Sequence, residues 1–152
     1  MKFSIEEKFS FSLLFIYLLT LGFFVTASAG RLVVSPEGGK FESIEKAISV
    51  AQPGDTVFIE PGTFKGGLKI EKDLTLKGAG KQEVRIQGSE KGKPLLLVGP
   101  SAVSVTVKNL TLQGASGELC ENRNRGVCPS GVSLVGKSQV KLRDVIVRSN
   151  EK

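Results

Sequence analysis

Residues 56–80, TVFIEPGTFKGGLKIEKDLTLKGAG, decide the fold of this 152-residue chain. Short runs within them alternate apolar and other residues, which is the period of a β-strand with one buried face. Glycine and proline separate the runs, and no helix-length interval lies between them. Similar runs return downstream as Val84–Ile86, Leu95–Val98, Val103–Val107, Leu110–Leu112, Val132–Leu134, Val140–Leu142 and Val145–Val147. This pattern predicts an all-β solenoid of stacked coils.

A short amphipathic helix is predicted ahead of the first coil. Ser43 is a suitable N-cap, and Pro53 and Gly54 end the segment. Four apolar residues share one helical face: Ile44, Ala47, Ile48 and Ala51. Such a helix would cover the open apolar end of the solenoid, and repeat proteins need caps of this kind for solubility.

The coils also repeat in sequence. Residues 105–114, VTVKNLTLQG, align with 140–149, VKLRDVIVRS, and with 68–78, LKIEKDLTLKG, apart from one extra residue in the last. Each unit consists of a strand, a polar corner and a second strand, with Asn109, Asp144 or Asp73 at the corner. Short polar side chains bond nearby backbone and tolerate sharp bends, so we interpret these residues as structural. The chain has room for roughly three such coils.

The first 29 residues have the features of a secretory signal peptide. A charged start is followed by an apolar run from Phe9 to Val25 and by small residues at 27–29, which predicts cleavage after Ala29. An uncleaved membrane anchor is the alternative, because the run approaches the ~20 apolar residues that a span requires. On either interpretation, the domain over 30–152 lies outside the cytoplasm, as a secreted, periplasmic or cell-surface protein.

The formal net charge of +6 lies entirely in residues 30–152, because Glu6 and Glu7 offset Lys2 and Lys8. A basic exported domain suits anionic partners such as uronic-acid polysaccharides, wall polymers or lipid head groups. The alternative is a solvated surface that binds no partner.

Aromatic residues are scarce in the same domain. The whole chain has no Trp, and its single Tyr, Tyr17, lies in the predicted leader. The aromatic residues of the domain are Phe41, Phe58 and Phe64. Because Phe58 and Phe64 fall in the apolar strand pattern, we expect both in the core. Platforms for stacking sugar rings or bases are therefore nearly lacking, and no nucleic-acid partner is expected.

A polar insertion from Ala115 to Ser130 interrupts the coil rhythm and contains both cysteines, Cys120 and Cys128. In an exported domain, two cysteines in one short loop are predicted to form a disulfide. A metal site is not predicted, because the chain has no His and two thiolates cannot complete a tetrahedral set.

The insertion also carries Arg123 and Arg125 at alternate positions. Loops that project from a rigid scaffold often bind ligands, and arginine binds carboxylate or phosphate in a bidentate manner. These two residues are therefore a candidate anion-binding site. The alternative is that Glu118 and Glu121 pair with them and the loop only adds solubility.

Residues 35–64, SPEGGKFESIEKAISVAQPGDTVFIEPGTF, resemble the opening of right-handed parallel β-helix proteins of the pectate-lyase-like superfamily. They contain a glycine-rich lead-in, an Ile-x-x-Ala-Ile helix, a Pro-Gly-Asp-Thr-Val turn and a Pro-Gly-x-Phe segment. The match continues through 74–80 and, more loosely, to Ser149. The resemblance implies a right-handed parallel β-helix with an N-terminal capping helix. It does not specify a reaction, because this fold hosts lyases, hydrolases, esterases, epimerases and noncatalytic surface proteins.

The active site of a pectin methylesterase, the enzyme that the N-terminal region resembles most, is not evident in this chain. That resemblance implies two aspartates, an arginine and glutamines on one face, from later coils. The aspartates present are Asp55, Asp73 and Asp144, each at a turn or corner, and no such catalytic segment follows residues 110–114.

The other activities of the superfamily also lack their residues. A pectate lyase needs acidic Ca²⁺ ligands beside an Arg or Lys base, and an inverting glycosidase needs paired carboxylates. Arg85, Arg143 and Arg148 lie in strands where their side chains can project outward, but no acidic pair accompanies them. Copper delivery would need His or Met, and the single Met is Met1.

We therefore expect an exported, noncatalytic β-helix that contacts polysaccharide or another anionic surface, with no cofactor. The alternative is the N-terminal part of a longer carbohydrate-active enzyme, because residues 145–152 stop on a strand without a cap and leave the domain incomplete. Uncovered inward residues would then favour self-association or a partner at this end: Val140, Leu142, Val145 and Val147.

Overall fold

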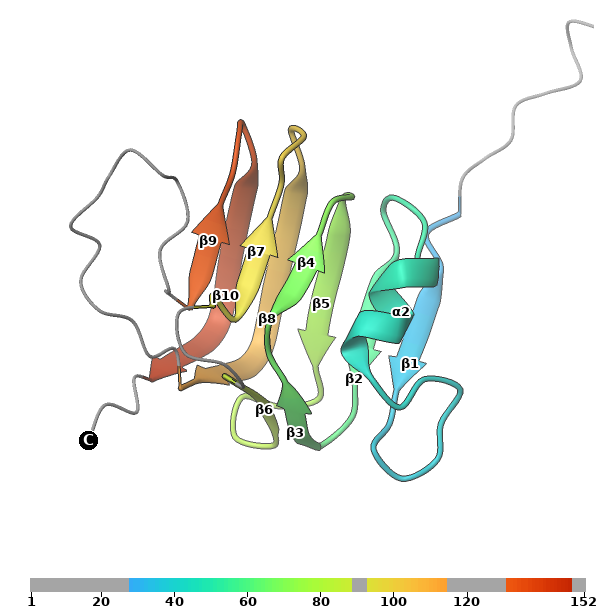
Figure 1. The fold of residues 1–152 in the computed structure, drawn as a ribbon. Coiled ribbons are helices and arrows are strands. Elements are labelled where there is room, and N and C mark those ends of the chain that lie inside the picture. Colours follow the sequence, from blue (N-terminus) through green and yellow to red (C-terminus); the bar gives the residue numbers. More distant parts are fainter. Residues whose placement is uncertain (1–27, 89–92, 115–130, 149–152) are drawn as a thin grey trace, which may run out of the picture.

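The computed structural model describes residues 28–88, 93–114 and 131–148. The predicted leader and the loop with Cys120, Cys128, Arg123 and Arg125 therefore lie outside the described residues, apart from Ser28 and Ala29. The elements, drawn in Figure 1, are β1 (Arg31–Val34), α2 (Ile44–Val50), β2 (Thr56–Ile59), β3 (Gly62–Lys65), β4 (Leu68–Ile70), β5 (Leu74–Gly78), β6 (Val84–Gln87), β7 (Leu96–Val98), β8 (Ser104–Gln113), β9 (Val132–Leu134) and β10 (Gln139–Arg148).

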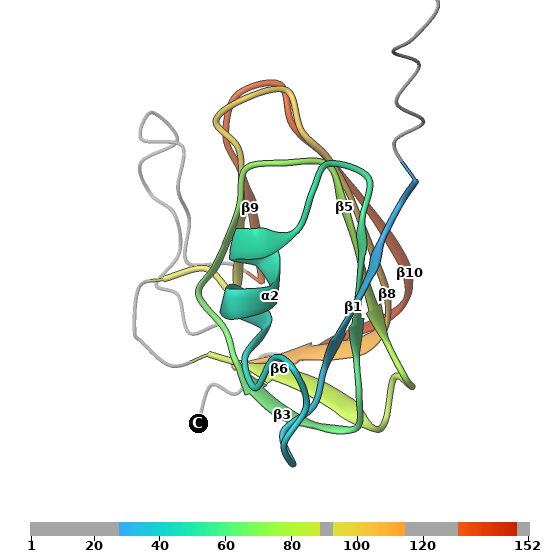
Figure 2. The same cartoon turned by 90° about the vertical axis from the view of Figure 1, so that its right-hand side faces the viewer.

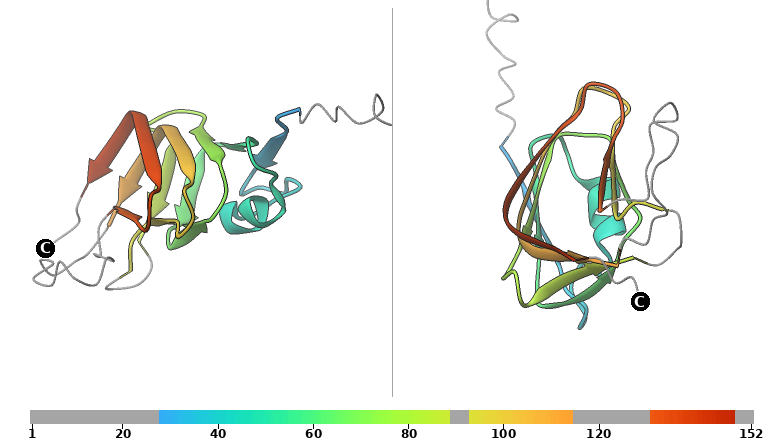
Figure 3. Two further views of the ribbon diagram at one scale, coloured as in Figure 1. Left: turned by 90° about the horizontal axis from the view of Figure 1, so that it is seen from above. Right: turned by 90° about the vertical axis from the view of Figure 1, so that its left-hand side faces the viewer.

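All strand pairs are parallel, and each strand pairs with the corresponding strand of the next coil. β2, β3 and β4 form one complete coil, and β5, β6 and β7 form the next. In the third coil β8 supplies two sides and β9 the remaining one, while β1 and β10 belong to partial coils at the ends. The circuit is seen end-on in Figure 2, and the stacking from above in Figure 3. This is a parallel β-helix of the predicted size.

The long strands β8 and β10 turn a corner at Asn109 and Asp144. Both residues have left-handed backbone conformations, with φ of 56° and 51°. Asparagine and aspartate tolerate this conformation better than other side chains, which explains their presence here. In the preceding coil, β5 ends at Gly78, where a Cβ atom would overlap the carbonyl oxygen of Asn109. The corner therefore requires specific residue types in adjacent coils.

The predicted alignment of 105–114 with 140–149 is confirmed, because Val105 pairs with Val140 and Leu110 with Val145. The alignment of 68–78 with them is wrong. Leu74 pairs with Val105, whereas β4 pairs with β7 on another side of the helix. Asp73 therefore stands at a different corner from Asn109. Its carboxylate accepts a hydrogen bond from the Ser104 amide at 2.7 Å, so its role is still structural.

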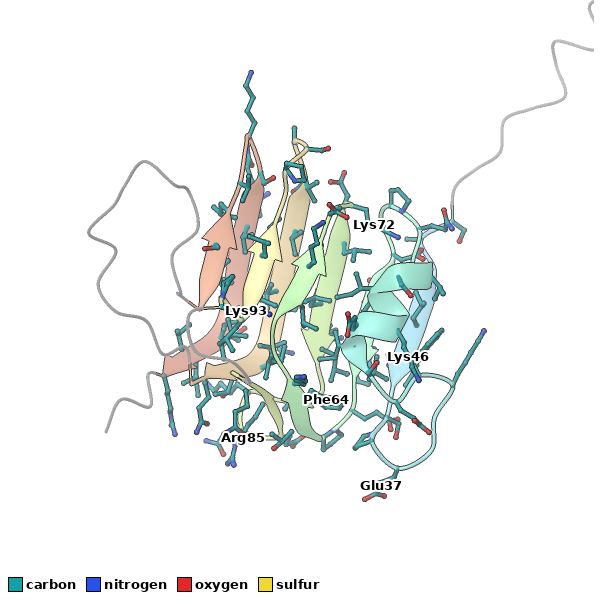
Figure 4. The ribbon with its side chains drawn as sticks, viewed as in Figure 1. Glu37, Lys46, Phe64, Lys72, Arg85 and Lys93 are labelled. Carbon is teal, nitrogen blue, oxygen red and sulfur yellow. The ribbon has the colours of Figure 1, made fainter. Side chains whose placement is uncertain are left out.

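The capping helix is confirmed in detail. The Ser43 hydroxyl accepts a hydrogen bond from the Lys46 amide at 3.3 Å, and the apolar face of α2 is buried at Ile44, Ala47 and Ile48. At the other end, the Lys72 ammonium donates to the carbonyl oxygens of Ala51 at 2.8 Å and Ser49 at 3.2 Å. A cation at this end also complements the helix dipole. Figure 4 shows Lys72 beside α2, which lies across the N-terminal end of the coils.

The core consists of the inward residues of the strands and helix, among them Val57, Ile59, Leu76, Ile86, Val107 and Leu112. Phe64 belongs to it and is 6% exposed, as predicted. Phe58 does not, and its predicted core position is wrong. Its neighbours Val57 and Ile59 are fully buried, and alternate side chains of a strand point to opposite faces, so Phe58 faces outward and is half-buried.

The prediction that the inward residues of the last partial coil are uncovered holds for Leu142 and Val147, whereas Val140 and Val145 are half-buried and pack against the core. Leu142 and Val147 pair with buried Val107 and Leu112, yet they are 47% and 56% exposed. Among the described strands, β10 pairs with β8 alone. In the part of the chain that the structure describes, no helix is long and apolar enough to cross a bilayer.

Candidate functional site

The first face is the outward side of β1, β2, β5, β8 up to Lys108, and β10 up to Arg143. The strand register stacks its side chains into two rows that cross five adjacent strands. The first row is Arg31, Thr56, Thr75, Thr106 and Lys141, and the second row is Val33, Phe58, Lys77, Lys108 and Arg143. Neither row contains a carboxylate.

A short repeated motif builds this face. Residues 75–77 (TLK), 106–108 (TVK) and 141–143 (KLR) each have a central apolar residue on the core side. The residues on both sides of it must then point outward, because side chains alternate along a strand. Adjacent strands lie ~4.8 Å apart, so the cations of neighbouring coils stand close together. The resulting positive potential attracts polyanions.

An aromatic ring lies beside these cations. The Arg31 guanidinium carbon is 4.1 Å from the centroid of the Phe58 ring, and the Lys77 ammonium is 5.9 Å from it. A guanidinium held over a ring keeps its in-plane N–H groups free to bind a carboxylate. Around this contact lies a shallow depression of about 250 Å³, lined by residues 29–31, Thr56, Phe58, Lys77 and Lys108. It combines hydroxyl, cationic and aromatic groups.

A larger depression of about 820 Å³ lies beside β1, but its chemistry is mixed. Its lining includes Glu37 and Glu60 as well as Arg31. The Asp55 carboxylate, which also lines it, accepts hydrogen bonds from the backbone amides of Gly30 at 2.6 Å and Gln52 at 2.7 Å. Both Asp55 oxygens therefore hold backbone in place. In the described ranges, no cluster of His, Cys, Asp or Glu could hold a metal ion.

The arginines singled out from the sequence are exposed, as expected, but they do not form one site. Arg143 lies on the first face, whereas Arg85 and Arg148 lie on the side formed by β6 and the end of β10. Figure 4 shows Arg85 pointing away from the ribbon. The candidate residues Arg123 and Arg125 lie outside the described residues, as do Cys120 and Cys128, so the anion-binding loop and the disulfide remain predictions.

Sequence reasoning missed most cations of the first face: Arg31, Lys77, Lys108 and Lys141. The signal was present in the three motifs at 75–77, 106–108 and 141–143. It could not be used because the alignment placed 74–76 on the wrong side of the helix.

No family model matches this sequence, and no curated protein matches it at a significant level. Among solved structures, the fold is similar to that of a mutant pectin methylesterase in complex with a hexasaccharide. The TM-score is 0.58 at 17% sequence identity, and the match covers 78% of this chain and 43% of that chain. The present chain therefore spans less than half the length of that protein. At this level of identity, the comparison shows that the two chains share the parallel β-helix fold.

Proposed function

We propose that this protein binds an acidic polysaccharide noncatalytically, through its first face, outside the cytoplasm. The observation that carries the proposal is the stacking of Arg31, Lys77, Lys108, Lys141 and Arg143 around a row of threonines, with no carboxylate in either row. The predicted leader supports export. The hexasaccharide bound by the solved pectin methylesterase, which has a similar fold, supports a carbohydrate ligand.

The chemistry of the face suits a uronate polymer. Cations on successive strands can each meet a carboxylate, and the threonine hydroxyls can donate to or accept from sugar hydroxyls. Because the members of a row come from different coils, a bound chain would run across the strands, parallel to the solenoid axis. Exposed ion pairs contribute only about 0.2–1 kcal/mol each, so useful affinity requires several of them along one chain.

The test is binding of polygalacturonate by the purified domain over residues 30–152. Replacing Lys77 and Lys108 with Glu should weaken binding at least about tenfold, which corresponds to about 1.4 kcal/mol. A control of equal net charge replaces Lys46 and Lys137, which are exposed on α2 and in the turn before β10. The control should bind nearly as well as the wild type.

Two further measurements separate this proposal from simple charge attraction. Binding should weaken as salt rises, and fully methyl-esterified pectin, which lacks the free carboxylates, should bind poorly. If both charge variants lose the same affinity, the attraction is general and the first face is not a site.

A second candidate is the N-terminal part of a longer carbohydrate-active enzyme. The observation that favours it is the coverage, because the matched solved chain is more than twice as long as the matched part. On this interpretation the catalytic coils lie outside the present chain, and a reading frame that continues downstream with further Val-x-Val coils would support it. We expect no turnover by the domain itself, since two of its three aspartates, Asp55 and Asp73, accept hydrogen bonds from backbone amides.

A further inference from the structure

The second face is the outward side of β3, β6, β8 from Leu110 and β10 from Val145. The register again stacks two rows across the strands: Thr63, Arg85, Thr111 and Ile146 in one, and Lys65, Gln87, Gln113 and Arg148 in the other. Neither row contains a carboxylate. Lys65, Arg85, Gln87 and Arg148 are exposed. Gln113 is half-buried, and Thr111 is buried, with its hydroxyl donating to the Lys81 carbonyl oxygen.

The two faces point in different directions. β8 and β10 each contribute to both, and the corner at Asn109 and Asp144 separates them. In the end view of Figure 2, the first face follows the side with β1, β8 and β10, and the second follows the side with β3 and β6. A single extended polymer lying along the solenoid axis on one face cannot also cover the other.

The third side of the solenoid shows that free cations are not spread evenly over the strands. Its outward row is Lys69, Leu97 and Ser133. The Lys69 ammonium lies 2.8 Å from a carboxylate oxygen of Glu71, Leu97 is half-buried, and Ser133 is buried. The only cation of this row is thus paired with an acid, whereas among the described residues the cations in the rows of the other two faces form no ion pair.

We propose that the second face is a separate binding site for acidic polysaccharide, so that one copy of the protein can bind two polymer chains and link them. The inference rests on the proposed function of the first face. The cations Lys65, Arg85 and Arg148 would meet carboxylates, and the amides of Gln87 and Gln113 would form hydrogen bonds with sugar hydroxyls, because an amide both donates and accepts. Linking follows from geometry, since two sites on different sides of a rigid coil cannot be filled by the same straight chain segment.

The first measurement is the number of short oligogalacturonates bound per protein, by calorimetry at low salt. The wild type should bind two. The double variants Lys65→Glu/Arg85→Glu and Lys77→Glu/Lys108→Glu should each bind one, and the control Lys46→Glu/Lys137→Glu should bind two. Unchanged circular dichroism and melting temperature show that each variant is folded.

The second measurement is light scattering with long polygalacturonate. Wild type and control should scatter strongly at intermediate ratios and less when either component is in excess, as expected for a bivalent linker. Each face variant should scatter at least about tenfold less while still binding the polymer. Protein alone at the same concentration measures any contribution from self-association.

The outcomes separate the two proposals. One oligosaccharide per wild-type protein, abolished by the Lys77→Glu/Lys108→Glu change, overturns the second site and leaves the first face standing. Binding that is abolished by Lys65→Glu/Arg85→Glu alone overturns the proposed function of the first face. Two oligosaccharides bound by every variant show that neither face is the site.

Discussion

The Asp55 carboxylate offers the sharpest test of how the N-terminal edge is held. It is 7% exposed and accepts hydrogen bonds from the amides of Gly30 and Gln52, one with each oxygen. Gly30 directly precedes the edge strand β1, and Gln52 follows the capping helix. This one side chain therefore ties together the edge strand, the cap and the first coil. The perturbation is Asp55→Asn, which keeps the shape but changes one acceptor into a donor.

The expected cost follows from these contacts. An asparagine can accept from only one of the two amides, and its NH₂ group then faces the other N–H, donor against donor. A hydrogen bond to a charged group contributes about 1.5–3 kcal/mol, and a buried donor left without a partner costs about 1–3 kcal/mol. We therefore expect Asp55→Asn to lower the free energy of unfolding by about 2–3 kcal/mol.

The predicted leader cleavage sharpens the test. Cleavage after Ala29 converts the Gly30 nitrogen, 2.6 Å from Asp55, into a charged ammonium group. In protein that starts at Gly30, Asp55→Asn should cost about 1 kcal/mol more than in protein that retains Ala29, because an ion pair is lost as well. The extra cost is the coupling energy of a double-mutant cycle.

The assay is urea unfolding of four proteins, with and without Ala29 and with Asp or Asn at position 55. Glu37→Gln, at an exposed carboxylate in the loop after β1, is the matched control and should leave stability unchanged. If the free energy of unfolding of the Asp55→Asn variant lies within about 0.5 kcal/mol of that of the parent, the reasoning about the two amides is wrong.

Three further predictions concern other parts of the chain. Gly78→Ala should destabilise the domain by at least about 1–3 kcal/mol in urea unfolding, because its methyl group would overlap the carbonyl oxygen of Asn109 in the next coil. Cys120 and Cys128 should form a disulfide in protein from its native compartment, and this bond should stabilise the domain by about 2–3 kcal/mol. Two free thiols found by nonreducing mass spectrometry would contradict this. Replacing Val145 and Val147 with Lys should reduce any concentration-dependent association, since this side of β10 presents exposed apolar groups. Sedimentation that shows a monomer up to near-millimolar concentration would refute the last of these.

The fold was predictable because its signals are local. Ser43 and the apolar spacing that begins at Ile44 predict the capping helix, and both are satisfied within one short segment. The corners at Asn109 and Asp144 were also found, because the residues around them repeat in the same order and the structure places them in register.

The candidate site was not predictable because it depends on which side of the coil each strand occupies. A strand period of two shows that Leu74 and Leu76 point inward, but not whether they belong with Val105 or with Leu110. Corners with Asp73 and Asn109 look alike in sequence although they lie at different places in the coil. If a strand is assigned to the neighbouring side of the coil, the cations of the first face are placed on different sides of the molecule. Only the observed strand register shows that they lie together.

The register also implies a conflict between stability and the proposed binding on the first face. Lys77 pairs with Lys108, and Lys108 with Arg143, so like charges stand directly opposite each other on three adjacent strands. Such pairs are destabilising, and a threonine, which occupies the neighbouring row, would fit a strand better.

Lys108→Thr should therefore raise the free energy of unfolding of the free protein by a few tenths to about 1 kcal/mol. The same change should weaken binding of polygalacturonate, because it removes a cation from the middle of the row. A ligand that neutralises these charges should in turn stabilise the wild type against heat more than it stabilises the variant. The discriminating result is that Lys108→Thr raises stability and lowers polymer affinity. If Lys108→Thr stabilises the protein and leaves polymer affinity intact, the cations are only a solvated surface.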